Sequence, residues 1–177
     1  MYLNGTEVHV MDGNTPLPIQ NLYSTPQTLG TDRISSAIGA YYETGCNNAV
    51  LCIDSGTALT YDIINAQGQY LGGNISPGMN MRFKSLNAFT SRLPLVGPSN
   101  ERTDIGISTE TAIRNGVMNG ISYEIQGYIS HFRKIYPDLK VFFTGGDAEN
   151  FVDKSKNYIF ADRNLVLKGL NIILNHL

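Results

Sequence analysis

The sequence predicts an α/β fold, and three observations support this prediction. Apolar runs at residues 49–53 and 58–64, and a third run at 69–75, are separated by short turns, which is the pattern of an antiparallel three-stranded unit. A long stretch with helical spacing of apolar residues follows, at about 107–136. Two further strands, at 140–143 and 158–160, alternate with helical segments, so strands and helices are expected to share a core.

The composition is that of a soluble globular protein of one core, or of two small lobes that share one. The 177 residues are 42% hydrophobic and 16% charged. A net charge of −2 with scattered basic residues argues against nucleic-acid binding. No apolar run reaches the length of a membrane span, and Met1–Gly5 lacks the features of a signal peptide. The sequence therefore predicts a cytoplasmic protein that binds neither nucleic acid nor membrane.

The cysteines and histidines carry no predicted site. Cys46 and Cys52 are six residues apart, one in an expected loop and one in an expected core strand, so a disulfide is not expected and Cys52 is predicted to be a buried free thiol. The three histidines show no metal-ligand spacing: His9, His131 and His176.

A connector and a helix come first along the chain. Residues 16–29 are rich in proline and threonine and predict an extended connector that ends at Gly30. The segment 31–42 predicts a helix with an apolar face, and either Thr31 or Asp32 can cap it. Alternatively, Asp32 stays ionised at the helix N-terminus and accepts a proton from a substrate alcohol, and Arg33 pairs with a substrate carboxylate.

The hairpin at residues 49–64 is the segment richest in chemistry. The first apolar run places Asp54 at a strand end, and Ser55-Gly56-Thr57 forms a tight turn. Gly56 leaves room for an anion, Thr57 offers a hydroxyl and an N–H, and Asp54 can hold a metal ion or a water beside a phosphate. The alternative is a plain glycine turn between core strands with an incidental aspartate.

The third strand and the next helix follow a turn at residues 65–68. Gly72-Gly73 weakens this strand where another backbone or a ligand can approach closely. Pro77 suits the first turn of a helix whose apolar residues are Met79, Phe83, Leu86 and Phe89. A loop at 96–102 is predicted to border the site.

The longest helix has an apolar stripe and two candidate caps, Thr109 and Thr111. Further apolar positions such as Met118 and Ile129 exceed what one small lobe needs to bury, which favours a subunit interface. The stripe consists of Ile113, Val117, Ile121, Ile125, Tyr128, Phe132 and Ile135.

The last part of the chain contains a glycine pair between a strand and a short helix. Gly145 and Gly146 let the chain pass close to an adenosine, or form a plain tight turn. A strand from Tyr158 follows, and Asp162 is a candidate cap of a final packing helix with apolar residues Leu165, Leu167, Leu170, Ile173 and Leu174.

The combined motifs resemble those of type III pantothenate kinases, members of the actin-like, acetate and sugar kinase superfamily. The first motif is Asp54-Ser-Gly-Thr57-Ala, Thr60-x-Asp62 and Gly72-Gly73-x-Ile75-x-Pro77-Gly78, which is similar to the family's second phosphate-binding region. Tyr23 with Gly30-Thr31-Asp32-Arg33 is similar to its substrate-binding residues, and Thr109 with Ala112 and Gly116 matches a further substrate contact. Thr144-Gly145-Gly146-Asp147-Ala148 resembles the superfamily's adenosine-side motif. The resemblance runs from about Thr15 to the end of the sequence.

This resemblance implies a ribonuclease H-like lobe of the actin-like ATPase type, with a mixed β-sheet flanked by helices. It also implies ATP-dependent phosphorylation of pantothenate to 4′-phosphopantothenate, the first step of coenzyme A biosynthesis. Asp32 would be the proton acceptor, and pantothenate would be held by Tyr23, Gly30, Thr31, Asp32, Arg33 and Thr109. Asp54 would ligate a monovalent cation, K⁺ or NH₄⁺, and ATP with Mg²⁺ would be bound by Gly56, Thr57, Gly145 and Gly146. The family also implies a homodimer.

The family's first phosphate-binding motif is not found in the sequence. Asp12-Gly13-Asn14-Thr15 resembles it, but one residue is missing and a returning strand would run through Pro16 and Pro18, so a turn is predicted. We therefore expect residues 1–29 to be a remnant of an N-terminal lobe with its connector, and residues 30–177 to be the C-terminal kinase lobe. The same observation motivates an alternative: the protein is a catalytically incompetent relative of these kinases, with a pantothenate-binding or regulatory role.

Overall fold

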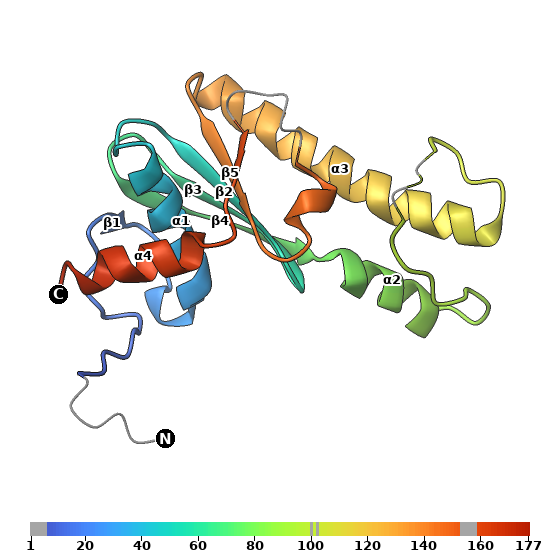
Figure 1. Cartoon of the computed structure of the whole chain (residues 1–177), viewed down its shortest axis with the longest axis horizontal. Helices are drawn as coiled ribbons and strands as arrows, with labels where there is room; N and C mark the ends of the chain where they lie inside the picture. Colours follow the sequence, from blue (N-terminus) through green and yellow to red (C-terminus); the bar gives the residue numbers. More distant parts are fainter. Residues whose placement is uncertain (1–6, 100, 102, 153–158) are drawn as a thin grey trace.

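The computed structural model describes residues 7–99, 101, 103–152 and 159–177. Its six-stranded sheet has the order β1-β4-β3-β2-β5-β6 (Figure 1). The strands are β1 Gln20–Asn21, β2 Val50–Ser55, β3 Ala58–Ile64, β4 Gln69–Pro77, β5 Lys140–Thr144 and β6 Ile159–Ala161. Strands β2, β3 and β4 pair antiparallel, β5 and β6 continue parallel to β2, and β1 is parallel to β4. This order confirms the predicted ribonuclease H-like lobe with a mixed sheet.

Helices cover both faces of the sheet because side chains along the central strands alternate between two apolar cores. Val50, Cys52 and Ile64 face the core shared with α1 (Thr31–Glu43) and α4 (Leu165–Leu174). Leu51 and Ile53 face the core shared with α3 (Thr109–Ile135). Helix α2 (Met79–Ala88) continues from β4 and packs on α3, and the two extend beyond the sheet (Figure 1). The described residues also contain two short 3₁₀ segments, η1 (Pro26–Thr28) and η2 (Ala148–Asn150).

Helices α1 and α4 lie backbone to backbone. A Cβ added at Gly169 would lie 1.8 Å from the carbonyl oxygen of Ser35, and one added at Gly39 would lie 2.4 Å from that of Leu165. Both positions therefore require glycine. The ion pair between Lys168 and Glu43, at 2.5 Å, joins the same two helices at the surface.

A polar cluster holds α2 and α3 against the sheet. The Glu124 carboxylate on α3 accepts hydrogen bonds from the hydroxyls of Tyr61 (3.0 Å) and Ser76 (2.6 Å), and pairs with Arg82 of α2. Burial raises the pKa of Glu124, but the hydrogen bonds from Ser76, Arg82 and Tyr61 outweigh it and lower that pKa overall. The carboxylate therefore stays ionised and connects four elements.

The predicted segments are confirmed, with small shifts in their ends. Asp54 lies inside β2, one residue before its end, and the connector at residues 16–29 contains β1 and η1. The Asp12–Thr15 segment is a turn as predicted, since the Thr15 N–H donates to the Asp12 carbonyl at 3.2 Å. Tyr158, the predicted start of β6, lies outside the described residues, as do Met1–Gly5 and residues 100 and 102 of the predicted loop.

The predictions of helix caps were wrong. The α1 cap is Gly30 rather than Thr31 or Asp32, and Pro77 ends β4 while Gly78 caps α2. The cap of α3 is Ser108, whose extended backbone (φ −139°, ψ 165°) lets its hydroxyl accept from the Thr111 N–H, with Thr111 bonding back to the Ser108 N–H. Thr109 is already helical and cannot take that conformation.

Asp162 does not cap α4, whose cap position is Asn164. Its carboxylate instead accepts from the Asn164 N–H at 2.8 Å and pairs with Lys168 at 2.7 Å. These two partners lower the pKa of Asp162 although partial burial alone would raise it.

Met118 and Ile129 do not add to a subunit interface, contrary to the prediction. Their side chains are 0% and 7% exposed, in the core between α3 and the sheet. The buried face of α3 is wider than the predicted stripe, while Ile135 of that stripe is 54% exposed.

Cys46 and Cys52 are free thiols, as predicted. No helix among the described residues combines the length and apolar character that crossing a membrane requires.

Candidate active site

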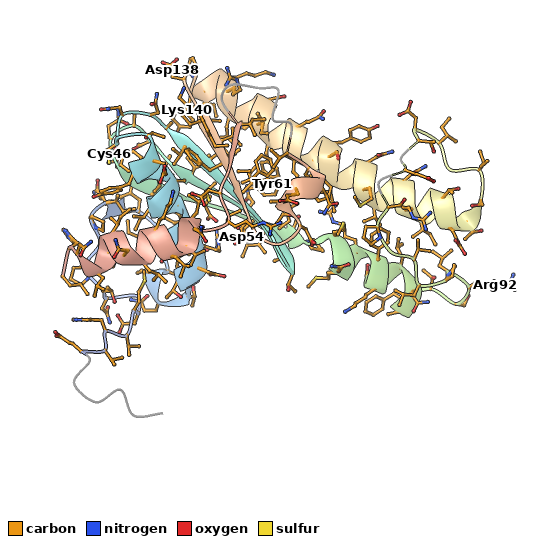
Figure 2. The ribbon with its side chains drawn as sticks, viewed as in Figure 1. Cys46, Asp54, Tyr61, Arg92, Asp138 and Lys140 are labelled. Atoms are coloured by element: carbon orange, nitrogen blue, oxygen red, sulfur yellow. The ribbon has the colours of Figure 1, made fainter. Side chains whose placement is uncertain are left out.

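Asp54 lies where three chain segments meet at one end of the sheet (Figure 2). It pairs in register with Thr60 on β3 and Thr144 on β5. A Cβ added at Gly145 (φ +90°) would lie 2.4 Å from Asp54 Oδ1, and one at Gly56 would lie 3.5 Å from it. The Asp147 N–H donates to the Ser55 carbonyl at 2.9 Å and ties the segment after β5 to β2. Gly56 and Gly145 thus leave the space that the Asp54 carboxylate occupies.

The Asp54 carboxylate carries an electrostatic cost. Burial raises its pKa, and the charges of Asp32 and Asp62 raise it further. Among the described residues, no donor hydrogen-bonds to this carboxylate. Thr60 opposite it has the one buried side-chain oxygen without a hydrogen-bond partner in the described part of the chain. A carboxylate beside an unpartnered hydroxyl is a donor set that fits a monovalent cation, whose charge would offset the cost.

Asp32 is exposed at the start of α1, next to this position. Its Oδ1 accepts the Arg33 backbone N–H at 2.8 Å, and a Cβ at Gly30 would lie 2.5 Å from it. The backbone N–H of the next residue thus orients the Asp32 carboxylate, which remains open to solvent. Thr31 beside it is exposed too. Helix α1, which begins at Thr31, packs on the face of β2 that carries Cys52 and Asp54, and the charge of Asp32 raises the pKa of Asp54.

Arg33 is buried and held by an acidic partner. Its Nη2 lies 2.6 Å from Asp62 Oδ1 and its Nε 3.3 Å from Asp62 Oδ2. Tyr70 donates from its hydroxyl to the same Oδ1 at 2.7 Å, and the Tyr23 ring lies with its centroid 5.8 Å from the guanidinium carbon. Burial lowers the pKa of Arg33, but the hydrogen bond and charge of Asp62 more than offset this and raise it. Arg33 and Tyr23 are therefore brought together beside Asp32.

Asp62 was missed as a site residue. It appeared in the sequence only as part of a motif, although a carboxylate in the apolar run 58–64 already indicates a buried charge with a partner. That signal marks the residue but cannot name Arg33, which lies 29 positions away.

Thr109 is not brought to this cluster. It lines a hollow of about 660 Å³ between α2 and α3, with Arg82, Leu86 and Ile113 among its neighbours. Figure 1 shows α1 and the N-terminal end of α3 at opposite ends of the molecule. Within one chain, Thr109 therefore cannot contact a ligand bound at Asp32.

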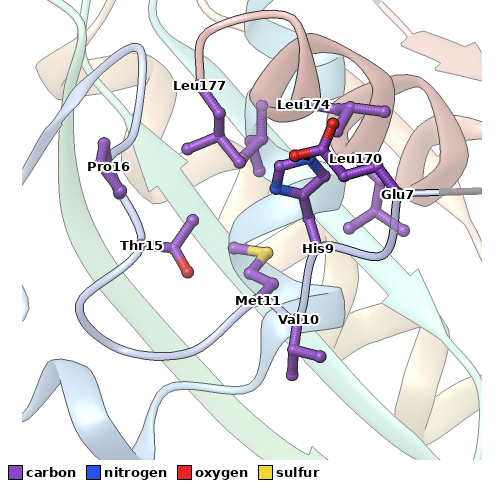
Figure 3. A pocket seen from close by; sticks show the side chains of 10 residues that line it. Glu7, His9, Val10, Met11, Thr15, Pro16, Leu170, Leu174 and Leu177 are labelled. Atoms are coloured by element: carbon purple, nitrogen blue, oxygen red, sulfur yellow. The ribbon is translucent and has the colours of Figure 1, made fainter.

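Two other predicted residues are at the surface. Thr57 is exposed at the hairpin tip, where its carbonyl accepts the Gly78 N–H at 3.0 Å. Gly146 is exposed, and a Cβ there would meet no atom within 4 Å. A further hollow, of about 460 Å³, lies between residues 7–16 and α4 (Figure 3) and contains none of the predicted site residues. Among the described residues, no three His, Cys, Asp or Glu side chains form a metal cage.

Comparison with known proteins identifies the family. The sequence profile of the type III pantothenate kinase family matches residues 1–131. The chain belongs to this family. It is 56% identical over 162 residues to the type III pantothenate kinase of Phocaeicola vulgatus, covering 92% of this chain and 66% of that protein. The corresponding kinase of Bacteroides fragilis is 54% identical over 166 residues, with 94% and 68% covered. The chain thus spans about two thirds of the length of these relatives.

One solved structure also resembles this member of the type III pantothenate kinase family. A conserved putative Baf family transcriptional activator from Campylobacter jejuni superposes with a TM-score of 0.62 at 28% identity, over 89% of this chain and 68% of that one. The likeness extends beyond the hairpin to nearly the whole chain and agrees with the observed arrangement of sheet and helices.

The cost of the Asp54 charge gives a pH prediction. Because its folded pKa is raised above the unfolded value of about 3.9, the folded protein binds more protons, so stability falls as pH rises from about 4 through the folded pKa. We expect Asp54→Asn to be more stable than the wild type at pH 7 and equally stable below pH about 4. Urea unfolding across this pH range measures the difference. Asp138→Asn, at an exposed position, is the control, and a variant less stable at pH 7 would contradict the assignment.

The glycine pair after β5 gives a second prediction. An alanine at Gly145 meets Asp54 and the Ser55 carbonyl and must keep a positive φ, whereas one at Gly146 meets open space. We expect Gly145→Ala to lower the free energy of unfolding by about 2 kcal/mol or more and Gly146→Ala to change it by less than about 0.5 kcal/mol. Urea denaturation of the two variants tests this, and equal effects would show that Gly145 does not constrain the carboxylate.

Proposed function

We propose that the protein catalyses ATP-dependent phosphorylation of pantothenate to 4′-phosphopantothenate, the first step of coenzyme A biosynthesis. The observation that carries the proposal is the placement of Asp32 beside Arg33 and close to Asp54, in a chain of this family. Transfer of a phosphoryl group to the hydroxyl of a carboxylic acid requires three groups. Asp32 would be the general base, Arg33 the cation that binds the substrate carboxylate, and Asp54 the carboxylate that binds a metal ion.

Asp32 takes the proton of the primary hydroxyl as this oxygen attacks the γ-phosphate. Its exposure and its orientation by the Arg33 N–H suit that role. Arg33 and Tyr23 hold the vitamin, with Gly30 and Thr31 beside them. Gly56, Thr57, Gly145 and Gly146 border ATP, whose phosphates have room because these positions carry small side chains or none. Positioning and charge neutralisation then supply most of the catalysis.

Two cations complete the proposed site. Asp54, with Thr60 opposite it, holds a monovalent cation, K⁺ or NH₄⁺, and Mg²⁺ accompanies ATP. Magnesium commonly binds through one or two carboxylates and the substrate's phosphates, so it needs no protein cage. Bound cations neutralise charge that builds up between the phosphates and the nearby aspartates.

A homodimer in the cytoplasm is also proposed. Its support is the position of Thr109, which can contact pantothenate only at the site of a second copy. Light scattering measures the molar mass and tests this state. We further propose that residues 1–29 are the remnant of an N-terminal lobe with its connector and that residues 30–177 are the C-terminal lobe.

The experiment that tests the function measures ADP release on adding pantothenate to protein, ATP, Mg²⁺ and K⁺. The expected result is ADP release that requires pantothenate. This release should fall when K⁺ is replaced by Na⁺. Absence of both turnover and pantothenate binding by calorimetry would overturn the proposal. Binding of pantothenate without turnover would instead indicate a catalytically incompetent protein. The relatives, which are named as kinases, do not support that alternative.

A further inference from the structure

Asp62 is a charged side chain in the middle of the sheet. It is 1% exposed, within a strand whose other residues are mostly apolar. A carboxylate at such a position requires partners that offset its lost hydration. Arg33 and the Tyr70 hydroxyl are these partners, at 2.6 Å and 2.7 Å from Oδ1.

The ion pair with Asp62 occupies only part of the Arg33 guanidinium. A guanidinium presents five N–H donors in one plane. Asp62 takes the edge formed by Nε and Nη2, so the donors of Nη1 are not bonded to Asp62, and Tyr23 is the other side chain that hydrogen-bonds this guanidinium. Planar, two-oxygen acceptors such as carboxylates suit these remaining donors.

A glycine lies directly against this buried pair. Arg33 is only 7% exposed, yet Gly73 beside it is exposed and has no side chain to cover it. A Cβ there would lie 2.9 Å from Arg33 Nη2 and 2.5 Å from Asp62 Oδ1. Any side chain at position 73 would therefore crowd the pair.

We propose that Asp62 is a positioning residue for substrate recognition. It fixes the rotation of Arg33 so that the Nη1 donors receive the carboxylate of pantothenate, and Tyr70 fixes Asp62 in turn. The inference rests on the proposed function, because it assigns how that same substrate is recognised. Without Asp62, the guanidinium remains a cation but has no fixed orientation.

The first test uses two tyrosines with matched surroundings. Tyr70 and Tyr61 are both fully buried, and each donates its hydroxyl to a carboxylate, Asp62 at 2.7 Å and Glu124 at 3.0 Å. We expect Tyr70→Phe to raise the Kd for pantothenate about 3- to 10-fold. Tyr61→Phe should leave it unchanged. Equal effects of the two variants would overturn the proposal.

The second test removes the carboxylate itself. We expect Asp62→Asn to raise the Kd and KM for pantothenate about 10- to 100-fold, with a smaller change in kcat. Its affinity for the neutral primary amide analogue of pantothenate should stay within about twofold, because no carboxylate is present to be recognised. A merely structural role would weaken both ligands alike, and that result would overturn the proposal.

A double variant covers the case in which Asp62→Asn does not fold. Arg33→Met combined with Asp62→Asn buries no unpaired charge. If Asp62 acts by orienting Arg33 toward the pantothenate carboxylate, this double variant binds pantothenate and its neutral primary amide analogue with affinities within about twofold of each other. A retained preference for the carboxylate over the amide would overturn the proposal. Absence of pantothenate binding by the wild-type protein would refute the proposed function itself, and calorimetry distinguishes that failure from the others.

Discussion

Asp32→Asn is expected to lower the turnover of pantothenate by about 10²- to 10⁴-fold, the range typical for loss of a general base. Asparagine has the same shape and can still accept the Arg33 N–H through its oxygen, so the start of α1 should be unchanged. It cannot accept a proton from the attacking hydroxyl. We therefore expect kcat to fall while the Kd for pantothenate changes little.

The measurement is ADP release at saturating pantothenate, with calorimetry for affinity. The matched control is Asp12→Asn, because Asp12 belongs to the turn whose sequence resembles a phosphate-binding motif and is exposed. It should turn over like the wild type. A variant at Asp32 that retains more than about a third of wild-type turnover would exclude this carboxylate as the base.

Gly169→Ala should be among the most destabilising single substitutions in the chain. The added Cβ would lie 1.8 Å from the Ser35 carbonyl oxygen, a backbone atom that moves only if α1 and α4 separate. Overpacking typically costs 1–3 kcal/mol, and we expect a loss near the upper end, about 3 kcal/mol. Because α1 carries Asp32 and Arg33, pantothenate binding should weaken as well.

The control for this substitution is Gly127→Ala in α3. It makes the same chemical change in a helix, but a Cβ there meets no atom within 4 Å. Alanine should instead stabilise the protein by about 0.5–1 kcal/mol through its better helix propensity. Urea unfolding of both variants gives the comparison. Similar stability changes in the two would show that α1 and α4 do not need their close contact.

Regular elements could be predicted because their signals are local. The apolar runs on either side of Gly56 predicted the β2–β3 hairpin correctly, because two apolar strands joined by a glycine turn determine a hairpin. Cap positions could not be predicted, because Ser108, Thr109 and Thr111 are equally suitable in sequence. The local backbone conformation decides among them: the Ser108 hydroxyl accepts the Thr111 N–H at 3.2 Å and Thr111 Oγ1 accepts the Ser108 N–H at 2.9 Å, so α3 begins at Thr109.

The candidate site could be predicted only where its residues are neighbours in sequence. Asp32 and Arg33 share a helix start, and their placement next to each other follows from local structure. The pairing of Arg33 with Asp62 depends on how α1 lies across the sheet, which the sequence pattern does not state. Thr109 was assigned to the same site by resemblance, but the extension of α2 and α3 beyond the sheet carries it away within one chain.

The contact between α1 and α4 also determines when the site can form during folding. Lys168 and Glu43, which join the two helices, are 125 residues apart in the sequence. Closing so long a loop costs conformational entropy before the contact compensates for it, and contacts of this range form slowly. The central hairpin, whose partners are adjacent, can form much earlier. We therefore expect Asp54 to reach its strand before α4 docks on α1, so recovery of the complete site is expected to be a late event in refolding.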